Sequence, residues 1–425
     1  MFGPLKYAFD RVVSEGTLDV RDSDGCVHHF GDRTGRRVAV HITRKRLEKE
    51  LTLNPQLALG EAFMNGQFRI EDGSIYDFLE VVLSNAVRRP FPRWLTRVEY
   101  LRRATKRLQQ YNPVTRSRSN VARHYDIDGR IYDLFLDRDR QYSCAYFTSG
   151  EEAFEDLETA QLAKKRHLAA KLALAHRPGP GQRVLDIGSG WGGLALYLAQ
   201  ISDAAITGIT LSTEQLKTAT ERARAAGLSN QVRFKLQDYR HLEGTFDRIV
   251  SVGMFEHVGV NHYDTFFERV RDLLDETGVA VIHSIGRSDE PAVTNQFIAR
   301  HIFPGGYIPA LSEVLPAIER SGLILTDVEI LRLHYAKTLR AWRERFLANR
   351  AEAVRIRGEE FSRMWEFYLA ASETAFRYQG LMVFQLQLTK RIDTLPITRD
   401  YMMAEESRLR MREHEASARP RMAGE

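Results

Sequence analysis

The sequence predicts an α/β protein, with a doubly wound, mostly parallel sheet preceded by a smaller N-terminal mixed α/β domain. Three observations support this prediction. Strand-like and helix-like segments alternate in the second part of the chain, and a glycine-rich turn joins the first of these strands to a helix. The earlier part mixes short strand-like runs with helical patterns.

The composition is that of a globular chain long enough for two domains. Its 425 residues are 43% hydrophobic and 28% charged. No apolar run approaches the roughly 18 residues of a transmembrane helix. The N-terminus carries Lys6, Asp10 and Arg11 within its apolar pattern, unlike a signal peptide. Because Cys26 and Cys144 are too few for a disulfide framework, we expect a protein of the reducing cytoplasm.

The N-terminal domain is expected over residues 1–118. Arg36–Ile42 is typical of a strand, whereas Asn54–Ile70 and Ser74–Val87 carry helical patterns, the second with Ser74 placed as its N-cap. Nothing in this domain indicates catalysis. We expect the catalytic domain over 119–395 and a charged tail over 396–425, which forms a frayed helix or is disordered.

A strongly basic segment ends the N-terminal domain. Arg88–Arg118 holds ten Arg and Lys against one acid, and its middle keeps a helical stripe of apolar residues at Trp94, Leu95, Val98, Leu101 and Leu108. A basic helix with an apolar face fits an anionic membrane surface. A solvated linker helix packed on a neighbouring domain fits equally well. Nucleic acid is not predicted as a partner, because no motif that reads RNA or DNA is present.

Six strands are predicted in the second part of the chain, with helical segments between them. This alternation implies parallel pairing, and no internal repeat interrupts it. The strands are Arg183–Ile187, Ala205–Thr210, Val232–Leu236, Asp247–Val252, Val279–Ile285 and Leu323–Ile330.

The turn after the first of these strands, "DIGSGWGG", indicates a nucleotide cofactor. Gly188, Gly190 and Gly193 fit the G-x-G-x-x-G pattern of a dinucleotide fold. Asp186 precedes the first glycine by two residues, which is the D-x-G-x-G form of methyltransferases that bind S-adenosylmethionine (SAM). The second strand ends in "ITGITLS", without the acid that would bind an NAD ribose. SAM is therefore the predicted cofactor, with NAD or a purely structural turn as alternatives.

Two later segments offer hydrogen-bond acceptors to such a cofactor. Thr210 and Gln215 could accept from ribose hydroxyls, although Ser212 and Gln215 also have the spacing of a capping box, so both roles stay open. Asp238 follows the third strand, where a carboxylate could accept from an adenine amino group. Tyr239 could line the ring. An exposed turn aspartate is the simpler alternative for Asp238.

A series of short blocks follows in order along the chain. "QYSCAYF" (141–147) and "GMFEHVG" (253–259) are far more specific than the glycine turn. The others are "HYD" at His124, "AQLAKKRHL", "VLDIGSGWGG", "TGITLSTEQ", "DYR", "FPGG", "HYAKTLRAW" and "RMWEFYLAAS". Together they resemble the cyclopropane-fatty-acyl-phospholipid synthase family, whose relatives include mycolic acid cyclopropane synthases. The resemblance is dense over His124–Leu388. It departs at Ser189, where the family usually has cysteine.

The resemblance implies a Rossmann-like class I SAM methyltransferase fold with a seven-stranded sheet and a lipid-binding N-terminal domain. It implies methylene transfer from SAM to the cis double bond of an unsaturated phospholipid acyl chain, giving a cyclopropane fatty acid. A homodimer attached peripherally to the inner face of the membrane is also implied. By resemblance, SAM lies against Tyr142, Ser143, the glycine turn, Thr210, Leu211, Gln215, Asp238 and Tyr239. A bicarbonate ion lies against Cys144, Glu256, His283, Ile285 and Tyr335.

The chemistry of this reaction makes such a set reasonable. An alkene is a weak nucleophile, so the methyl group must be held in line and water excluded. Aromatic faces can stabilise the resulting carbocation, and the candidates are Tyr142, Tyr146, Phe147, Phe255 and Tyr335. A base must then remove one proton so that the ring closes. Bicarbonate is the expected base, with His283 and Tyr335 as its donors. Glu256 either orients His283 or accepts the bicarbonate proton.

Other readings of the chain stay open. A relative could make a methyl-branched or methylated unsaturated lipid from the same cation. A small-molecule methyltransferase and a non-catalytic lipid-binding protein share the fold. We expect an apolar channel that ends near Cys144. No metal is predicted, because Glu256 and His257 lack the spacing of a metal site.

Overall fold

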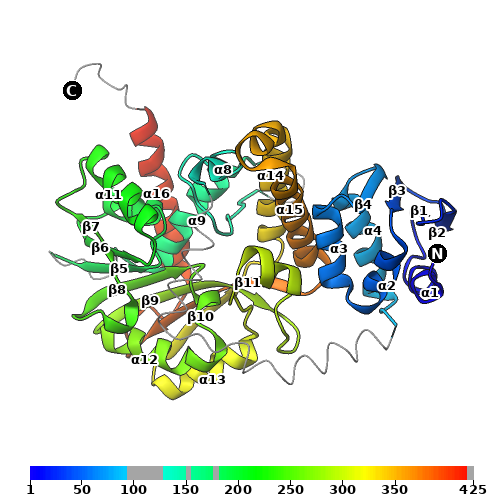
Figure 1. The fold of residues 1–425 in the computed structure, drawn as a ribbon. Helices are drawn as coiled ribbons and strands as arrows, with labels where there is room; N and C mark the ends of the chain where they lie inside the picture. The colour runs from blue at the N-terminus through cyan, green and yellow to red at the C-terminus, as the bar shows by residue number, and fades with distance from the viewer. Residues whose placement is uncertain (93–127, 150–154, 176–180, 419–425) are drawn as a thin grey trace. The chain divides into compact units, whose positions relative to one another are not determined.

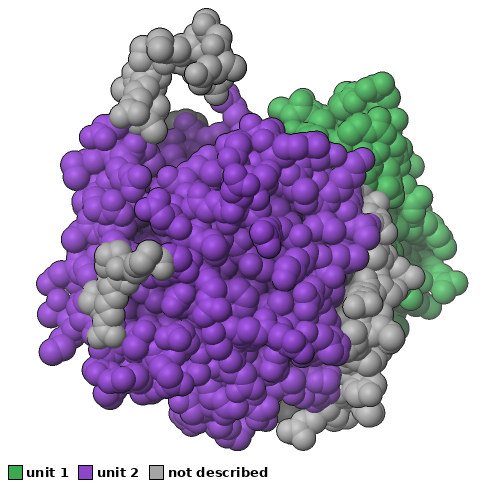
Figure 2. Space-filling model, turned by 90° about the vertical axis from the view of Figure 1, so that its left-hand side faces the viewer, with its two compact units in different colours: residues 1–136, 286–310, 335–382 green, residues 137–285, 311–334, 383–425 purple. Residues whose placement is uncertain are grey.

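The computed structural model describes residues 1–92, 128–149, 155–175 and 181–418. The chain forms two compact units, each assembled from separate stretches. Unit 1 comprises 1–136, 286–310 and 335–382, and unit 2 comprises 137–285, 311–334 and 383–425; Figure 2 colours them green and purple. The domain limits drawn along the sequence stay a prediction. The predicted basic helix at Trp94–Tyr111 and the block at His124 lie outside the described residues.

Unit 1 contains a small mixed sheet and several helices (Figure 1). Its elements are α1 (Gly3–Val12), β1 (Thr17–Arg21), β2 (Val27–Phe30), β3 (Arg37–Ile42), α2 (Lys45–Leu53), α3 (Pro55–Met64), β4 (Phe68–Asp72), α4 (Ile75–Arg88), α8 (Gly129–Asp133), α14 (His334–Ala348, from its second residue) and α15 (Arg350–Tyr378). The strand order is β2-β1-β3-β4. β1 pairs antiparallel with β2 and parallel with β3, and α15 packs against α3 and α4.

The two predicted N-terminal helices differ in how well their limits were predicted. The helix expected over Asn54–Ile70 ends at Met64, because Gly66 adopts a positive φ of 69° and the chain then enters β4. For the next helix the predicted cap is confirmed. The Ser74 hydroxyl accepts from the backbone N–H of Asp77 at 3.2 Å, and α4 begins at the following residue.

Unit 2 is built on a seven-stranded sheet in the order β10-β11-β9-β8-β5-β6-β7. Its strands are β5 (Arg183–Ile187), β6 (Ala205–Thr210), β7 (Val232–Leu236), β8 (Phe246–Val252), β9 (Leu274–Arg287), β10 (Ile324–Ile330) and β11 (Leu381–Thr389). Its helices are α9 (Leu157–Lys171), α10 (Gly193–Ile201), α11 (Thr213–Ala225), α12 (Tyr263–Leu273), α13 (Leu311–Ser321) and α16 (Asp400–Ala418). The five strands β7, β6, β5, β8 and β9 pair in parallel, and β10 pairs antiparallel with β11. The predicted fold class is confirmed, although the sequence did not single out β11.

The strand order reverses direction at β5. From β5 the chain proceeds outward to β6 and β7, then returns to form β8 and β9 on the other side. As Figure 1 shows, α11 and α16 lie on one face of the sheet and α12 and α13 on the other. Ligands of such sheets bind at the carboxyl ends of the strands where the order reverses. From the fold we therefore expect a ligand site at the carboxyl ends of β5 and β8.

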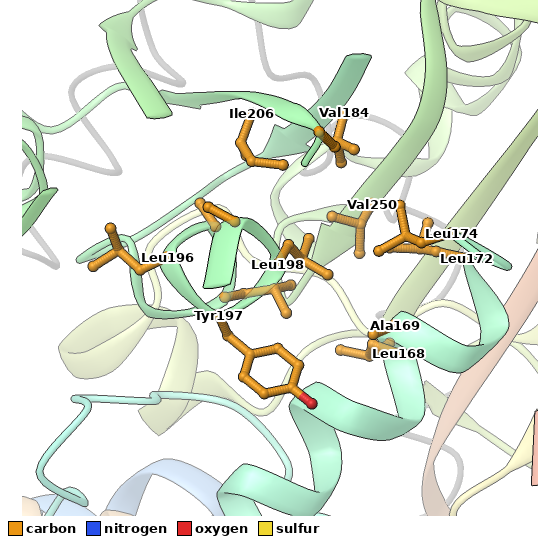
Figure 3. Packing of buried hydrophobic residues seen from close by; sticks show 14 of the residues in the cluster. Leu168, Ala169, Leu172, Leu174, Val184, Leu196, Tyr197, Leu198, Ile206 and Val250 are labelled. Atoms are coloured by element: carbon orange, nitrogen blue, oxygen red, sulfur yellow. The ribbon is translucent and has the colours of Figure 1, made fainter. Parts of the chain in front are cut away.

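The core of unit 2 on the α9 and α10 face of the sheet is a layer of aliphatic side chains (Figure 3). It joins the apolar positions of both helices to residues of β5, β6 and β8, including Leu168, Leu172, Val184, Leu198, Ile206 and Val250. Nearly every residue of α10 is buried, which is why its sequence is apolar on all sides. This packing fixes α9 and α10 on the sheet beside the predicted glycine turn.

The C-terminal tail is not a frayed or disordered segment, which corrects the prediction for residues 400–418. These residues form α16, which packs against α9 and places Leu409 in the core layer. Polar contacts add to this packing: Glu413 pairs with Arg166 at 2.9 Å and accepts from the Tyr197 hydroxyl at 2.7 Å. Its sequence shows only a weak apolar periodicity, and among the described side chains of α16 the buried hydrophobic ones are Met402 and Leu409. Among the described helices, none is long and apolar enough to cross a membrane.

The burial of Leu409 predicts a measurable cost of truncation. We expect Leu409→Ala to lower the free energy of unfolding by about 2–5 kcal/mol, because it opens a cavity in the core layer. Met411, two residues further along α16, is 61% exposed. Met411→Ala is the control and should change the free energy of unfolding by about 0.5 kcal/mol or less. Urea denaturation measures both, and equal values for the two variants would show that α16 does not pack as described.

Candidate active site

Backbone hydrogen bonds shape the glycine turn between β5 and α10. The N–H groups of Gly188 and Ser189 both donate to the carbonyl oxygen of Ile209 on β6, each at 3.0 Å. Gly188 and Gly190 have φ values of 83° and 54°, which residues with side chains rarely adopt. A Cβ atom at Gly188 would lie 2.9 Å from Met254 Cβ, whereas one at Gly190 would meet nothing within 4 Å. The turn therefore leaves backbone at Gly190 open to a ligand.

Asp186, near the end of β5, is buried without a hydrogen bond to its Oδ2 atom among the described residues. Burial raises the pKa of Asp186 to about 7, and the positive charge of Lys164 on α9 opposes this rise only in part. Buried polar atoms are normally satisfied. An orphaned acceptor beside an open glycine turn is therefore a candidate contact for a polar ligand.

Thr210, Leu211 and Gln215 lie where β6 passes into α11. The Thr210 hydroxyl donates to Gln215 Oε1 at 2.8 Å and accepts from the N–H of Ser212 at 3.1 Å. Ser212 is the N-cap of α11 and accepts from the backbone N–H of Gln215. The Gln215 side chain thus contacts Thr210 and is not the reciprocal half of a capping box. Both side chains are buried, and Leu211 between them is half-buried.

Asp238 and Tyr239 follow β7, as predicted, and Asp238 is buried rather than exposed. Its carboxylate accepts from Arg240 Nη2 at 2.7 Å and Nε at 2.9 Å. Burial alone would raise the pKa of Asp238, but these bonds and the Arg240 charge hold it below its ordinary value. The Tyr239 ring packs edge-to-face on Phe266, with centroids 5.4 Å apart. Asp238 thus provides a carboxylate that stays ionised at neutral pH, and Tyr239 provides an aromatic ring held in place.

The segment Gln141–Cys144 is held by two buried side chains of α9. Lys164 Nζ donates to Gln141 Oε1 and, at 2.9 Å, to Ser143 Oγ. Gln161 Nε2 donates to the carbonyl oxygen of Ser143 at 3.0 Å. Burial lowers the pKa of Lys164 to about 8, against the negative charges of nearby aspartates. Lys164 was not among the predicted site residues, although it lies three residues after Gln161 in the block "AQLAKKRHL".

Asp139 links the same segment to the glycine turn. Its carboxylate accepts from Lys165 Nζ at 2.7 Å and forms an ion pair with Arg222 of α11. Arg222 also donates to the carbonyl oxygen of Trp191 in the turn at 2.7 Å. A Cβ atom at Gly193 would lie only 2.4 Å from Asp139 Oδ2. Glycine at position 193 leaves room for this carboxylate and for the Gln141 amide, whose Nε2 atom would lie 2.3 Å from the same Cβ.

Glu256 contacts Ile285 near the carboxyl ends of β8 and β9, and His283 lies two residues before Ile285. The N–H of Ile285 donates to Glu256 Oε1 at 2.7 Å. Glu256 Oε2 has no hydrogen-bond partner among the described residues. Burial raises the pKa of Glu256 to about 7, against the opposing effect of the Ile285 N–H and the Ser284 hydroxyl. Glu256 can therefore gain or lose a proton near neutral pH.

His283 is buried and neutral at pH 7. Burial lowers its pKa well below the ordinary value, and the charges of Lys164 and Lys171 act in the same direction. Its Nδ1 atom lies 3.1 Å from Gln385 Nε2 on β11. The sequence analysis missed Gln385, because the two residues are 102 positions apart and β11 was not among the predicted strands.

The remaining predicted anion ligands are Cys144 and Tyr335. The Cys144 thiol is buried and donates to the carbonyl oxygen of Ala145 at 3.3 Å. Tyr335 belongs to unit 1, where its ring packs edge-to-face on Trp342 and against Phe376. Of the five predicted anion ligands, Glu256 and Ile285 are in direct contact and His283 lies on the same strand. The shared role of all five stays a prediction.

Among the aromatic candidates, Tyr146 and Phe255 stack on rings whose centroids lie less than 5 Å away. Tyr146 is stacked between His167 and His334, at centroid distances of 4.2 and 4.8 Å. Phe255 stacks on Tyr263 at 4.6 Å and is fully buried. The faces of Tyr146 are therefore unavailable to a carbocation, and Phe255 is a core residue. Tyr142, Phe147 and Tyr335 remain candidates.

The residues at the ends of β5, β6 and β7 fit the predicted cofactor. SAM carries an amino group, ribose hydroxyls and an adenine amino group, all of which need acceptors in a buried site. The open backbone at Gly190 and the orphaned Oδ2 of Asp186 meet the first need. The buried oxygens of Thr210, Gln215 and Asp238 can meet the others.

Known proteins match both the sequence and the fold. The model of a family described as mycolic acid cyclopropane synthetase matches residues 113–386, and that of a domain of unknown function matches 5–88. The chain is 37% identical over 347 residues to the cyclopropane-fatty-acyl-phospholipid synthase of Escherichia coli strain K12, covering 81% of this chain and 86% of that protein. It is 32% identical over 400 residues to tuberculostearic acid methyltransferase UfaA1 of Mycobacterium tuberculosis, covering 91% and 88%. The structure of mycolic acid cyclopropane synthase CmaA1 complexed with SAH and CTAB matches with a TM-score of 0.59 and 32% identity, covering 66% of this chain and 99% of that one.

The contacts of Lys164 predict that it supports cofactor binding. We expect Lys164→Met to weaken binding of S-adenosylhomocysteine roughly 10-fold, equivalent to about 1.4 kcal/mol, because Gln141 and Ser143 lose their shared donor. Lys171→Met is the matched control, since it removes a buried lysine of the same helix that pairs with Glu329 instead. Its affinity should stay within about twofold of the wild type. Titration calorimetry measures both. Equal weakening in the two variants would contradict a specific role of Lys164.

The raised pKa of Glu256 predicts a pH-dependent stability difference. A carboxyl group with a folded-state pKa of about 7 stabilises the folded protein fully only below its unfolded pKa, near 4.5, and loses this contribution as the pH rises through about 7. The Glu256→Gln variant has no titratable group at this position, so its stability does not fall in this way as the pH rises. Its free energy of unfolding should therefore rise relative to the wild type between about pH 5 and pH 7 and level off above. Urea denaturation across this range measures the difference, and parallel curves would contradict the raised pKa.

Proposed function

The chain belongs to the mycolic acid cyclopropane synthetase family and is a SAM-dependent methyltransferase; on that premise we propose that it converts unsaturated phospholipid acyl chains to cyclopropane fatty acids, with bicarbonate as the base. The two π electrons of the cis double bond form a bond to the methyl carbon of SAM, whose carbon–sulfur bond breaks. One proton leaves the added methyl group, and the ring closes at the cationic carbon. The balance of the reaction is one added CH2 per acyl chain and one released proton.

The observation that carries this proposal is the state of Glu256. Its free Oε2 atom and its pKa of about 7 give the ends of β8 and β9 a carboxyl group that holds or releases a proton under working conditions.

The other residues of the proposed base site have separate tasks. The neutral imidazole of His283 and the Tyr335 hydroxyl would donate hydrogen bonds to the bicarbonate ion, which supplies the base when bound. The proton that it collects would pass to Glu256 Oε2. Cys144, which is buried, and Ile285, which is half-buried, would contribute walls and backbone groups that limit the access of water to a carbocation.

SAM, when bound, supplies an electrophilic methyl group. The proposed binding residues are Tyr142, Ser143, Asp186, Gly188, Gly190, Thr210, Leu211, Gln215, Asp238 and Tyr239. Within this set, the chain's own contribution is orientation: Lys164 fixes the position of Ser143, and Thr210 fixes Gln215. Fixed acceptors lower the entropy lost when the reacting groups come together.

We further propose that the enzyme works as a peripheral membrane protein. The basic segment Arg88–Arg118 would dock on anionic lipid, where each nearby Lys or Arg contributes on the order of 1 kcal/mol. Withdrawing an acyl tail from the bilayer into water costs roughly 0.8 kcal/mol of free energy for each methylene group that is exposed. The proposal therefore includes an apolar channel that ends near Cys144, and a homodimer as the assembly.

The similarity to one relative supports a second product, a methylated acyl chain without a ring. UfaA1, named for methyl transfer, aligns with 91% of this chain. A proton lost from a different carbon of the same cation would give a methylated chain without a ring. The substrate and the site would be unchanged.

Product analysis tests the proposed function. Purified protein given SAM, bicarbonate and vesicles of oleoyl phospholipid should yield acyl chains heavier by one CH2, and mass spectrometry of derivatised esters distinguishes a ring from a branch. Glu256→Gln and His283→Ala should each lower the rate by about 10² or more, because proton transfer loses a group. Glu276→Gln, an exposed glutamate of β9, is the control.

Two further arms separate the parts of the proposal. In buffer stripped of carbon dioxide the rate should fall, and added bicarbonate should restore it. Vesicles that contain anionic lipid should be better substrates than neutral ones, and this advantage should shrink at high salt. Unchanged fatty acids in every arm would reject the lipid substrate, whereas a bicarbonate-independent rate would reject only the base.

A further inference from the structure

Gln385 lies beside the proposed base site on a strand that the sequence did not predict. β11 is next to β9 in the sheet, and both Gln385 and His283 are buried. Their side chains meet at 3.1 Å between Gln385 Nε2 and His283 Nδ1. The pair therefore joins β9 and β11 through buried side chains.

The chemistry of the two groups restricts the position of the imidazole proton. An amide nitrogen only donates, so an Nδ1 atom that faces it must accept, and the proton of a neutral ring then resides on Nε2. The opposite rotamer of the amide would require a proton on Nδ1. It would leave Nε2 as an acceptor, which cannot bind an anion.

Burial is the main reason why the ring of His283 stays neutral. Lys164, Lys171 and His167 of α9 also disfavour a positive charge on the ring, and Glu329 of β10 favours it. The neutral ring of His283 therefore has one N–H group, and the orientation of the Gln385 amide determines whether it is on Nδ1 or on Nε2.

We propose that Gln385 is a positioning residue that holds His283 in the tautomer with its proton on Nε2, so that this N–H donates to the anion of the base site. This inference rests on the proposed function for the identity of the anion. When the hydrogen bond from Gln385 to His283 Nδ1 is removed or its direction is reversed, the tautomer changes although the imidazole remains. Gln385 itself touches no reacting group.

Nitrogen NMR of the full-length protein reads the tautomer directly. In protein labelled with ¹⁵N in the histidine rings, the signals of His283 are those lost in both His283→Asn and His283→Gln variants. The wild type should show an unprotonated Nδ1 and a protonated Nε2. In Gln385→Glu the carboxylate only accepts, so Nδ1 should become protonated. A wild-type ring with its proton on Nδ1 would overturn the proposal.

Steady-state kinetics with SAM and oleoyl phospholipid vesicles give the functional arm. Gln385→Leu should lower kcat roughly 10- to 100-fold, with KM for SAM within about twofold, because an oriented donor is lost from the transition state. Gln387→Leu is the matched control. It removes a buried amide two residues along the same strand that donates to Lys171 O and the Tyr401 hydroxyl. It should retain kcat within about threefold.

The outcomes distinguish a failure of the positioning role from a failure of the proposed function. Equal losses of kcat in Gln385→Leu and Gln387→Leu, or no loss in either, would overturn the positioning role. If the wild type modifies no lipid, the proposed function fails. The NMR measurement still decides the tautomer, because it does not depend on turnover.

Discussion

A buried ammonium group must keep hydrogen-bond acceptors close to it, and Lys164 keeps two, the side chains of Gln141 and Ser143. These contacts hold the segment that leads to Cys144 along α9. α9 is in turn fixed on the sheet by the aliphatic layer beneath it. The same charge acts on Asp186 at the end of β5 and on His283 of β9. One lysine therefore contributes both to the geometry of the segment 141–144 and to the electrostatics of Asp186 and His283.

Buried acids of unit 2 have contrasting environments. Some carboxylates are paired with cations: Glu329 contacts His167 and Lys171, and its pKa falls to about 2, and Asp238 after β7 pairs with Arg240. Asp186 of β5 and Glu256 after β8 are instead buried without a full set of partners, and their pKa values rise to about 7. Leaving buried acids unpaired costs stability, which a fold retains where the groups serve binding or proton transfer. This contrast makes Asp186 and Glu256 candidate functional groups independently of any likeness to other proteins.

Local patterns were sufficient for much of this fold. Strands β5, β6 and β7 have the predicted limits, because each is a short apolar run bounded by turn residues. The Ser74 cap and the glycine turn were likewise predictable from neighbouring residues. Lys164, Gln385 and α16 were not, since what gives them their roles are contacts with residues far away in the sequence: Gln141 is 23 positions from Lys164, and Glu413 is 216 positions from Tyr197. A weakly amphipathic helix such as α16 is identified only when its partner surface is known. The cofactor was predictable from the spacing of Asp186 and the glycines, whereas the anion ligands came from the family resemblance.

A crystal structure of the complex with S-adenosylhomocysteine shows directly whether Lys164 and the glycine turn serve one cofactor site. We expect the ligand on the backbone of Gly188–Gly190, with a polar group of the ligand bonded to Asp186 Oδ2 and with Lys164 still bonded to Gln141 and Ser143. A ligand bound away from the glycine turn, or a Lys164 side chain released to solvent while the ligand is in place, would refute such a site.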